Sequence, residues 1–158
     1  MFKLLLFLLV SLSFVSCTNK NNAFKYFEKA NIQSQTIQNT KKTDILLKGE
    51  PKVLFWATYL NNIEKFENLK KETFIVTVYF TDASSQDIVE NNYKVMLNGK
   101  DTLTSIKIDK DNLEYKEMLV SNSWANHYLV EFDEIKDVYN LNLKLTNGSS
   151  QAQLKFEK

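Results

Sequence analysis

Apolar and polar residues alternate along most of the chain from Asp44 onward, and this alternation constrains the fold more than any other feature. In residues 73–80, every second position is Phe or Val. Successive side chains of a strand point to opposite faces, so this spacing predicts a strand with one buried face. Five later runs have the same period and predict further strands. They are Tyr93–Leu97, Ile106–Ile108, Tyr128–Phe132, Leu141–Leu145 and Ala152–Phe156.

Two further features of this region indicate a sandwich. Residues 53–60 are apolar on both faces, so we expect a central strand or one covered by an N-terminal helix. Asn98-Gly99 and Asn147-Gly148 each lie between two strand-like runs, and Asn and Gly adopt the positive φ angles that a type I′ hairpin turn requires. Short strands separated by such turns predict a mainly β chain, folded over residues 43–158 as an antiparallel β-sandwich.

Tyr139 suggests the type of sandwich. This tyrosine enters a late strand-like run two residues before Leu141, an expected core position. The placement resembles the tyrosine corner of immunoglobulin-like domains. The resemblance implies an immunoglobulin-like β-sandwich, a scaffold that hosts many unrelated functions.

A short helical segment is expected before the sandwich. Phe24, Phe27 and Ala30 recur at helical spacing, which predicts a helix that begins near Ala23 with Asn22 as its N-cap. Residues 34–42 show a second, weaker helical pattern. We expect this segment to lie over one end of the sandwich, because its apolar face is small and its charges are mixed; the alternative is an amphipathic helix that lies on a membrane or binds a partner.

The first residues of the chain have the pattern of an export signal. Lys3 precedes the apolar run Leu4–Leu12, and Phe14-Val15-Ser16-Cys17 follows it. The run suits the h-region of a signal peptide, roughly 7–15 residues, and is too short for the roughly 20 residues of a membrane-spanning helix. Phe14-Val15-Ser16-Cys17 resembles the lipobox of bacterial lipoproteins, in which the signal peptide is cut just before a cysteine that carries lipid. A chance cysteine near another cleavage site and a buried thiol are the alternatives.

The lipobox resemblance implies a lipid anchor and a location. Residues 1–16 would be removed, Cys17 would carry a diacylglycerol on its sulfur, and residues 17–42 would form a tether and the helical segment. In the sorting pattern of enteric Gram-negative lipoproteins, Asp after the cysteine retains the protein in the inner membrane. Thr18 stands there instead, which implies the outer membrane of a bacterial cell envelope. Because Cys17 is the only cysteine, no intramolecular disulfide can form.

Composition argues against several classes of partner. The chain has 20 basic and 19 acidic residues, and every basic residue is a lysine. The guanidinium groups that bind phosphates and bases in a bidentate manner are therefore missing, which weighs against nucleic-acid binding. No spacing of histidines and cysteines indicates a zinc site, and no cofactor motif is apparent. Asp109-Lys110-Asp111-Asn112 is expected to be a solvated turn, since it lacks the glycine and distal glutamate of a calcium loop.

Two residues are candidates for a site. His127, the only histidine, is expected on the solvent-facing side of its strand; the alternative is a general base for Ser121 or Ser123 in an envelope hydrolase. Trp124 lies in a polar, loop-like stretch, where an indole either packs on a neighbouring strand or binds a partner, whereas Trp56 is expected in the core. The sequence thus favours a non-catalytic, lipid-anchored protein that binds an envelope protein or a glycan; a purely structural subunit of an envelope complex is the further alternative.

Overall fold

The computed structural model describes residues 20–158, so Cys17 and the predicted signal peptide lie outside the described residues. The chain divides into two compact units, residues 1–31 and residues 32–158. Helix α2, Lys20–Gln38, includes residues of both units. Within the described residues, no helix is both long enough and apolar enough to cross a membrane.

Helix α2 differs from the two helical stretches expected from the sequence. It starts at Lys20, so Asn22 lies within the helix and is not its N-cap. It ends at Gln38, and the chain then enters strand β1, Thr40–Leu47. The prediction of helix over residues 40–42 was wrong because Lys41 and Lys42 pair with strand β2, Glu50–Tyr59, and this pairing outweighs a weak helical pattern.

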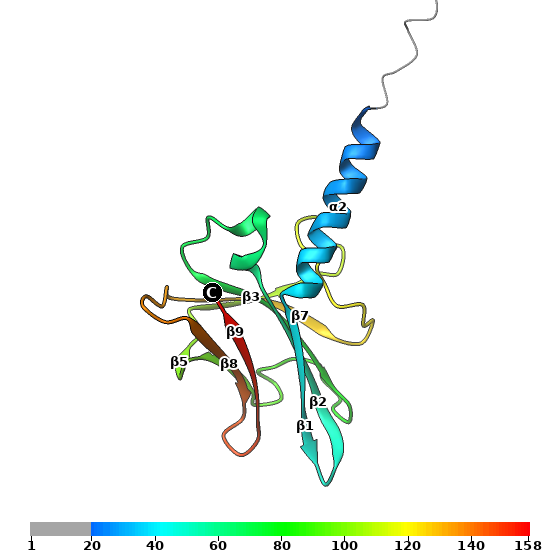
Figure 1. Ribbon diagram of the computed structural model, residues 1–158. Coiled ribbons are helices and arrows are strands. Elements are labelled where there is room, and N and C mark those ends of the chain that lie inside the picture. The colour runs from blue at the N-terminus through cyan, green and yellow to red at the C-terminus, as the bar shows by residue number, and fades with distance from the viewer. Residues whose placement is uncertain (1–19) are drawn as a thin grey trace, which may run out of the picture. The chain divides into compact units, whose positions relative to one another are not determined.

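The described residues contain nine strands in two antiparallel sheets, which confirms the predicted antiparallel class (Figure 1). The first sheet has the order β1-β2-β3-β7-β6, and the second has the order β5-β4-β8-β9. The strands of the first sheet are β1 Thr40–Leu47, β2 Glu50–Tyr59, β3 Glu72–Phe80, β7 Asn126–Phe132 and β6 Thr104–Ile108. Those of the second are β5 Lys100–Asp101, β4 Lys94–Leu97, β8 Asn140–Thr146 and β9 Gln151–Glu157.

The sheet order can be compared with that of immunoglobulin-like sandwiches. If β1 and β5 are left out and the remaining strands β2, β3, β4, β6, β7, β8 and β9 are lettered A to G in chain order, the first sheet has the order A-B-E-D and the second has the order C-F-G. The correspondence concerns strand order alone. The predicted tyrosine corner is absent, because the Tyr139 hydroxyl donates to the Glu157 carboxylate (3.2 Å) rather than to the backbone upstream, and the Tyr139 side chain is exposed.

The main core lies between the two sheets and is built from the alternating apolar residues. Phe74 of β3 is fully buried, and its ring centroid lies 4.9 Å from that of Tyr59 in β2 and 5.3 Å from that of Phe156 in β9. These contacts join the inner faces of the first and second sheets. Burying an aromatic or branched side chain of this size stabilises a fold by about 1.5–3 kcal/mol.

A second, smaller cluster of buried apolar residues lies on the outer face of the first sheet. Ile75 of β3 and Ile108 of β6 are buried there, against Met118 of the long connection between β6 and β7. We call this connection, residues 109–125, the covering segment. Residues 60–66, which form two short 3-10 helices after β2, complete the same cluster together with Ile32 of α2.

Two hairpin turns have the backbone of a type I′ turn. Asn98 and Gly99 have φ values of 47° and 82°, as predicted, and Lys48 and Gly49 have 53° and 85° in a hairpin that the sequence analysis missed. The turn between β8 and β9 is different: the Asn147 side chain accepts the N–H groups of Ser149 and Ser150. A lysine in the left-handed region is unusual, so Gly49 is the only residue of this pair whose type indicates a turn.

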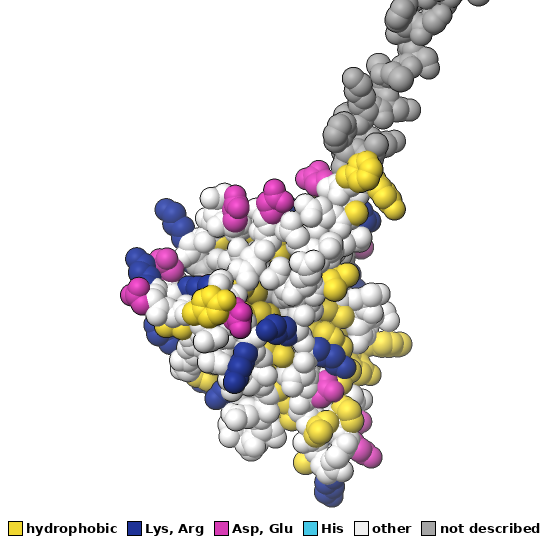
Figure 2. Space-filling view, in the orientation of Figure 1, with side chains coloured by type: hydrophobic (Ala, Val, Ile, Leu, Met, Phe, Trp, Pro, Cys, Tyr) yellow, Lys and Arg dark blue, Asp and Glu magenta, His cyan; other side chains and the backbone are white. Residues whose placement is uncertain are grey.

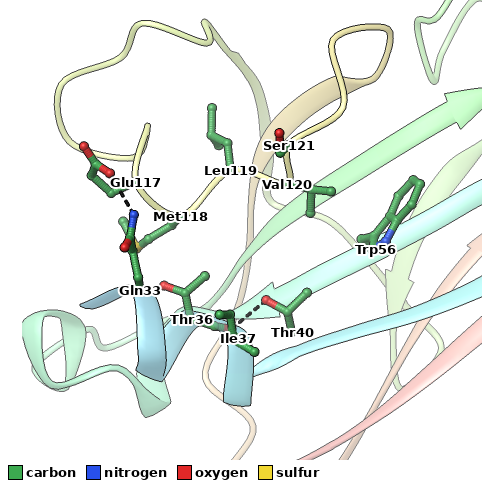
Figure 3. Close-up of a pocket in the computed structure, with 10 residues that line it drawn as sticks. All are labelled: Gln33, Thr36, Ile37, Thr40, Trp56, Glu117, Met118, Leu119, Val120 and Ser121. Atoms are coloured by element: carbon green, nitrogen blue, oxygen red, sulfur yellow. Dashed lines mark hydrogen bonds between the residues drawn. The ribbon is translucent and has the colours of Figure 1, made fainter. Parts of the chain in front are cut away.

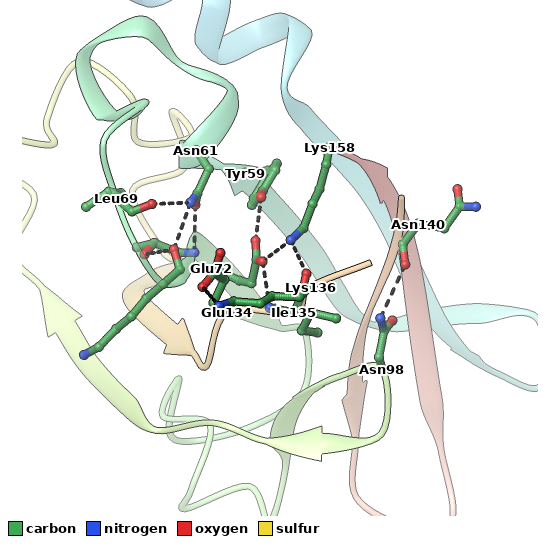
Figure 4. Close-up of polar contacts among 12 residues, drawn as sticks. Tyr59, Asn61, Leu69, Glu72, Asn98, Glu134, Ile135, Lys136, Asn140 and Lys158 are labelled. Atoms are coloured by element: carbon green, nitrogen blue, oxygen red, sulfur yellow. Dashed lines mark hydrogen bonds and ion pairs between the residues drawn. The ribbon is translucent and has the colours of Figure 1, made fainter. Parts of the chain in front are cut away.

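A buried carboxylate joins segments from both sheets (Figure 4). Glu72 at the start of β3 accepts a hydrogen bond from the Tyr59 hydroxyl (2.6 Å) and one from the backbone N–H of Ile135 (3.1 Å). The ammonium group of Lys158, directly after β9, forms an ion pair with Glu72 and donates to the Ile135 carbonyl. The Tyr59 bond lies within the first sheet, whereas the ion pair with Lys158 depends on the packing of the two sheets against each other.

Replacement of Lys158 by methionine is expected to destabilise the fold by about 3 kcal/mol, because the buried Glu72 carboxylate loses its counterion. The free energy of unfolding in urea measures this effect. The matched control is Lys155→Met, which removes an exposed lysine of the neighbouring strand β9 and should change stability by less than about 0.5 kcal/mol. Equal losses in both variants would contradict a special role of the buried pair.

Candidate functional site

A groove opens on the outer face of the first sheet (Figure 3). One wall is the chain from Gln33 to Thr40 at the end of α2, and the other is residues 117–121 of the covering segment, with Trp56 of β2 at one end. The groove has a volume of about 490 Å³, which is within the usual range for a small-molecule site. Gln33 donates to the Glu117 carboxylate across it at 3.2 Å.

Trp56 lines this groove and does not belong to the core between the sheets. Alternate residues of β2 face the two sides of the sheet, and Trp56 shares the outer side with Thr58. The ammonium group of Lys42 in β1 lies 5.2 Å from the centre of the indole ring, a cation–π contact. The expectation of a core tryptophan was wrong. Apolar residues occur on both faces of β2 because both faces are covered, but the outer face, on which Trp56 lies, is covered only in part.

His127 is buried, with 2% of its surface exposed, and so contradicts the expected solvent-facing position. It does lie on the outer face of β7, opposite Tyr128 and Val130, as the alternation predicted. That face is not open to solvent at this point, because the covering segment packs on the neighbouring residues Ile108 and Leu129. The alternation indicated the face of the sheet, but not whether another segment covers it.

The partner of His127 is a threonine of the adjacent strand. Thr77 pairs with His127 in the β3–β7 register, and its hydroxyl lies 2.8 Å from the His127 Nδ1. Burial, together with the positive charge of Lys110, lowers the pKa of His127 to about 4, so the imidazole is neutral at pH 7. Thr77 is itself 1% exposed, so this pair is not arranged as an accessible nucleophile and base.

A second hollow lies beside His127, which we call the His127 hollow. It has a volume of about 450 Å³ and is lined by residues 107–111 and by the start of β7 at residues 125–127. Asn112 closes the turn at residues 109–112, since its N–H donates to the Asp109 carbonyl at 2.9 Å. The expected turn at residues 109–112 is therefore confirmed, and no group of three or more histidine, cysteine or acidic side chains among the described residues could hold a metal ion.

Trp124 is exposed to 74% on a loop next to the His127 hollow. Its backbone N–H donates to the Asn122 side chain at 3.0 Å, and the ammonium group of Lys110 donates to the Ser123 carbonyl. Ala125, the next residue, is buried and lines the hollow. The indole therefore lies on an anchored loop and is not packed in a core.

Some features of these sites were not identified from the sequence. The pairing of Thr77 with His127 needs the strand register, and the groove combines residues 33–40 with residues 117–121, far apart along the chain. Ser121 lines the groove, whereas His127 lines the other hollow. The sequence indicated one feature of these sites: the alternation of apolar residues placed His127 on the face opposite Tyr128.

Comparisons with known proteins give no further assignment. A scan against protein-family models, a search of curated proteins and a search of solved structures found no match.

The burial of His127 predicts a specific pH dependence of stability. Its pKa is about 4 in the folded chain, against an ordinary value near 6.5, so the folded state binds fewer protons than the unfolded state between these pH values. This contribution to stability is complete above pH 6.5 and is lost as the pH falls toward 4. At pH 4.5, the loss amounts to about 2–3 kcal/mol.

Urea unfolding of the protein and of His127→Gln at pH 7.5 and pH 4.5 measures the effect. The variant should lose about 2–3 kcal/mol less than the unchanged protein over this interval, because glutamine does not titrate. Since the chain has a single histidine, an NMR titration of its imidazole gives an independent check on the unchanged protein. A midpoint near 6.5 would contradict the burial of the ring.

Proposed function

We propose that the protein is a non-catalytic binding protein of a bacterial cell envelope, anchored by lipid on Cys17, and that it contacts its partner through Trp124. The anchor is supported by the apolar run Leu4–Leu12 and by the lipobox-like Phe14-Val15-Ser16-Cys17. One acyl chain gives only marginal membrane binding, whereas two or more anchor a protein durably. Thr18 after the cysteine favours the outer membrane.

The exposure of Trp124 carries the binding part of the proposal. Tryptophan is among the residues that contribute most to binding at interfaces, and the Trp124 indole is 74% exposed. The hydrogen bonds at Asn122 and Ser123 hold the loop in place, so little conformational entropy is lost when a partner covers the ring.

The buried Thr77–His127 pair supports a non-catalytic role. A nucleophile and its base must reach substrate atoms, and both side chains here have almost no exposed surface. On the face of the sandwich in Figure 2, lysine and acidic side chains are mixed, and neither sign forms a continuous surface. This distribution supports a partner recognised by local contacts and not by a large electrostatic field.

Trp124→Ala is expected to weaken partner binding by tenfold or more, which corresponds to a loss of about 1.4–2 kcal/mol for an interface tryptophan. Recovery of partners that co-purify with the anchored protein from its own membrane, quantified by mass spectrometry, provides the measurement. Leu113→Ala removes another exposed apolar side chain of the covering segment and should leave recovery unchanged. Unchanged recovery with Trp124→Ala would refute the proposed contact.

Cys17→Ala is expected to abolish lipid attachment and to leave an uncleaved or mislocalised precursor, because the lipid is attached to the cysteine sulfur before cleavage. Metabolic labelling with a clickable fatty acid reports the attachment directly. Ser16→Ala keeps a small residue before the cysteine and should be labelled like the unchanged protein. Equal label on Cys17→Ala would exclude the anchor.

A further inference from the structure

The His127 hollow contains donors and acceptors of both charges around a neutral ring. Asp109, Lys110 and Asp111 line it, so side chains of both charges lie beside the ring. Lys107 and Asn126 also line the hollow, but they pair with Tyr128 and Val78, so their side chains lie on the other face of the sheet. The Asn126 amide donates there to the Gln86 carbonyl at 3.0 Å. The three charged side chains offer both donors and acceptors of hydrogen bonds.

His127 directs an unpartnered polar atom into this hollow. The ring is 98% buried, and within the described residues its one hydrogen bond joins Nδ1 to Thr77. Among the buried side-chain nitrogen and oxygen atoms of the described residues, only the Asp44 Oδ1 is both inaccessible and without a hydrogen-bond partner. The His127 Nε2 also has no protein partner, but it is not one of the inaccessible atoms. We infer that its accessible surface faces the hollow that His127 lines.

A buried polar atom that faces a hollow needs a hydrogen-bond partner from outside the protein. An unsatisfied nitrogen costs about 1–3 kcal/mol, and a ligand hydroxyl or a water molecule removes this cost. A neutral imidazole can accept or donate at Nε2, according to its tautomer, and a hydroxyl can match either state. The chemistry of Nε2 is thus suited to a ligand with hydroxyl groups.

We propose that the His127 hollow binds one unit of a neutral saccharide, with Nε2 of His127 bonded to a hydroxyl group and the indole of Trp124 covering a neighbouring unit. The proposal rests on the proposed binding function and specifies the class of ligand. Lys110 and the two aspartates supply a donor and acceptors that match the hydroxyls of a sugar, each of which both donates and accepts. The apolar C–H face of a sugar ring matches the flat surface of an exposed indole.

Other ligand classes fit the lining less well. Asp109 and Asp111 oppose a phosphate or another anion, and the chain has no arginine to bind it in a bidentate manner. Lys110 opposes a cation, and no sufficient group of metal ligands is present among the described residues. A purely apolar ligand would leave the buried Nε2 without a hydrogen bond.

The single histidine makes the test direct, because its imidazole NMR signals need no assignment. The full chain in detergent micelles is titrated separately with four neutral probes: chitohexaose, cellohexaose, maltohexaose and mannohexaose. With at least one of them, we expect a saturable change in the Nε2 chemical shift and in tryptophan fluorescence. No change with any of the four at 10 mM, about the weak limit of specific binding, would overturn the proposal.

Matched variants separate the hollow from the rest of the surface. Asp111→Asn and Trp124→Ala should each raise the dissociation constant for the active oligosaccharide about tenfold, whereas Leu113→Ala should leave it unchanged. Binding that survives in both of the first two variants would overturn the assigned site. A saturable shift with inorganic phosphate and with none of the sugars would overturn the ligand class.

The same variants distinguish this inference from the proposed function. If Trp124→Ala abolishes partner recovery from membranes while no saccharide binds, the binding function stands and the saccharide assignment fails. If neither readout responds to Trp124→Ala, both proposals fail together.

Discussion

The packing of the sandwich depends on the neutralisation of one buried charge. Glu72 of β3 lies in the interior, where an unpaired carboxylate would cost several kcal/mol. Its partners are Tyr59 of β2, the backbone of Ile135 before β8, and Lys158 after β9. These groups belong to segments of both sheets, so they reach the carboxylate together only when the sheets are packed. The ring contacts of Phe74 with Tyr59 and Phe156 lie on the same strands and favour the same arrangement.

The groove beside Trp56 and the His127 hollow both lie at the outer face of the first sheet. A sheet with one buried face and one solvated face would present only alternating polar residues. Here Ile75, Leu129 and Ile108 continue the apolar surface on the outer side, and the covering segment and the end of α2 pack over it. The groove beside Trp56 and the His127 hollow both lie next to this covering segment and are lined in part by its residues.

Alternation predicted most of the strands because it reports directly on one buried face. The residues of β3, β7, β8 and β9 that were expected to share a face are buried in the core between the sheets. Prediction failed where a pairing partner, and not a local pattern, decided the structure. Residues 40–42 are a strand because they pair with β2, and the hairpin at Lys48-Gly49 forms although lysine rarely adopts a positive φ. Burial of His127 and partial exposure of Trp56 both follow from what covers the outer face.

The sequence by itself determined the two-sheet, antiparallel class of the fold, the inward face of its strands and the Asn98-Gly99 turn, because side-chain period and backbone preference are local properties. It also carries the lipobox-like segment, which is a linear signal. Tertiary structure alone decided that Thr77 meets His127, that Lys158 meets Glu72, and that residues 33–40 face residues 117–121. Each of these contacts joins residues far apart along the chain, and strand register and sheet packing set their distance.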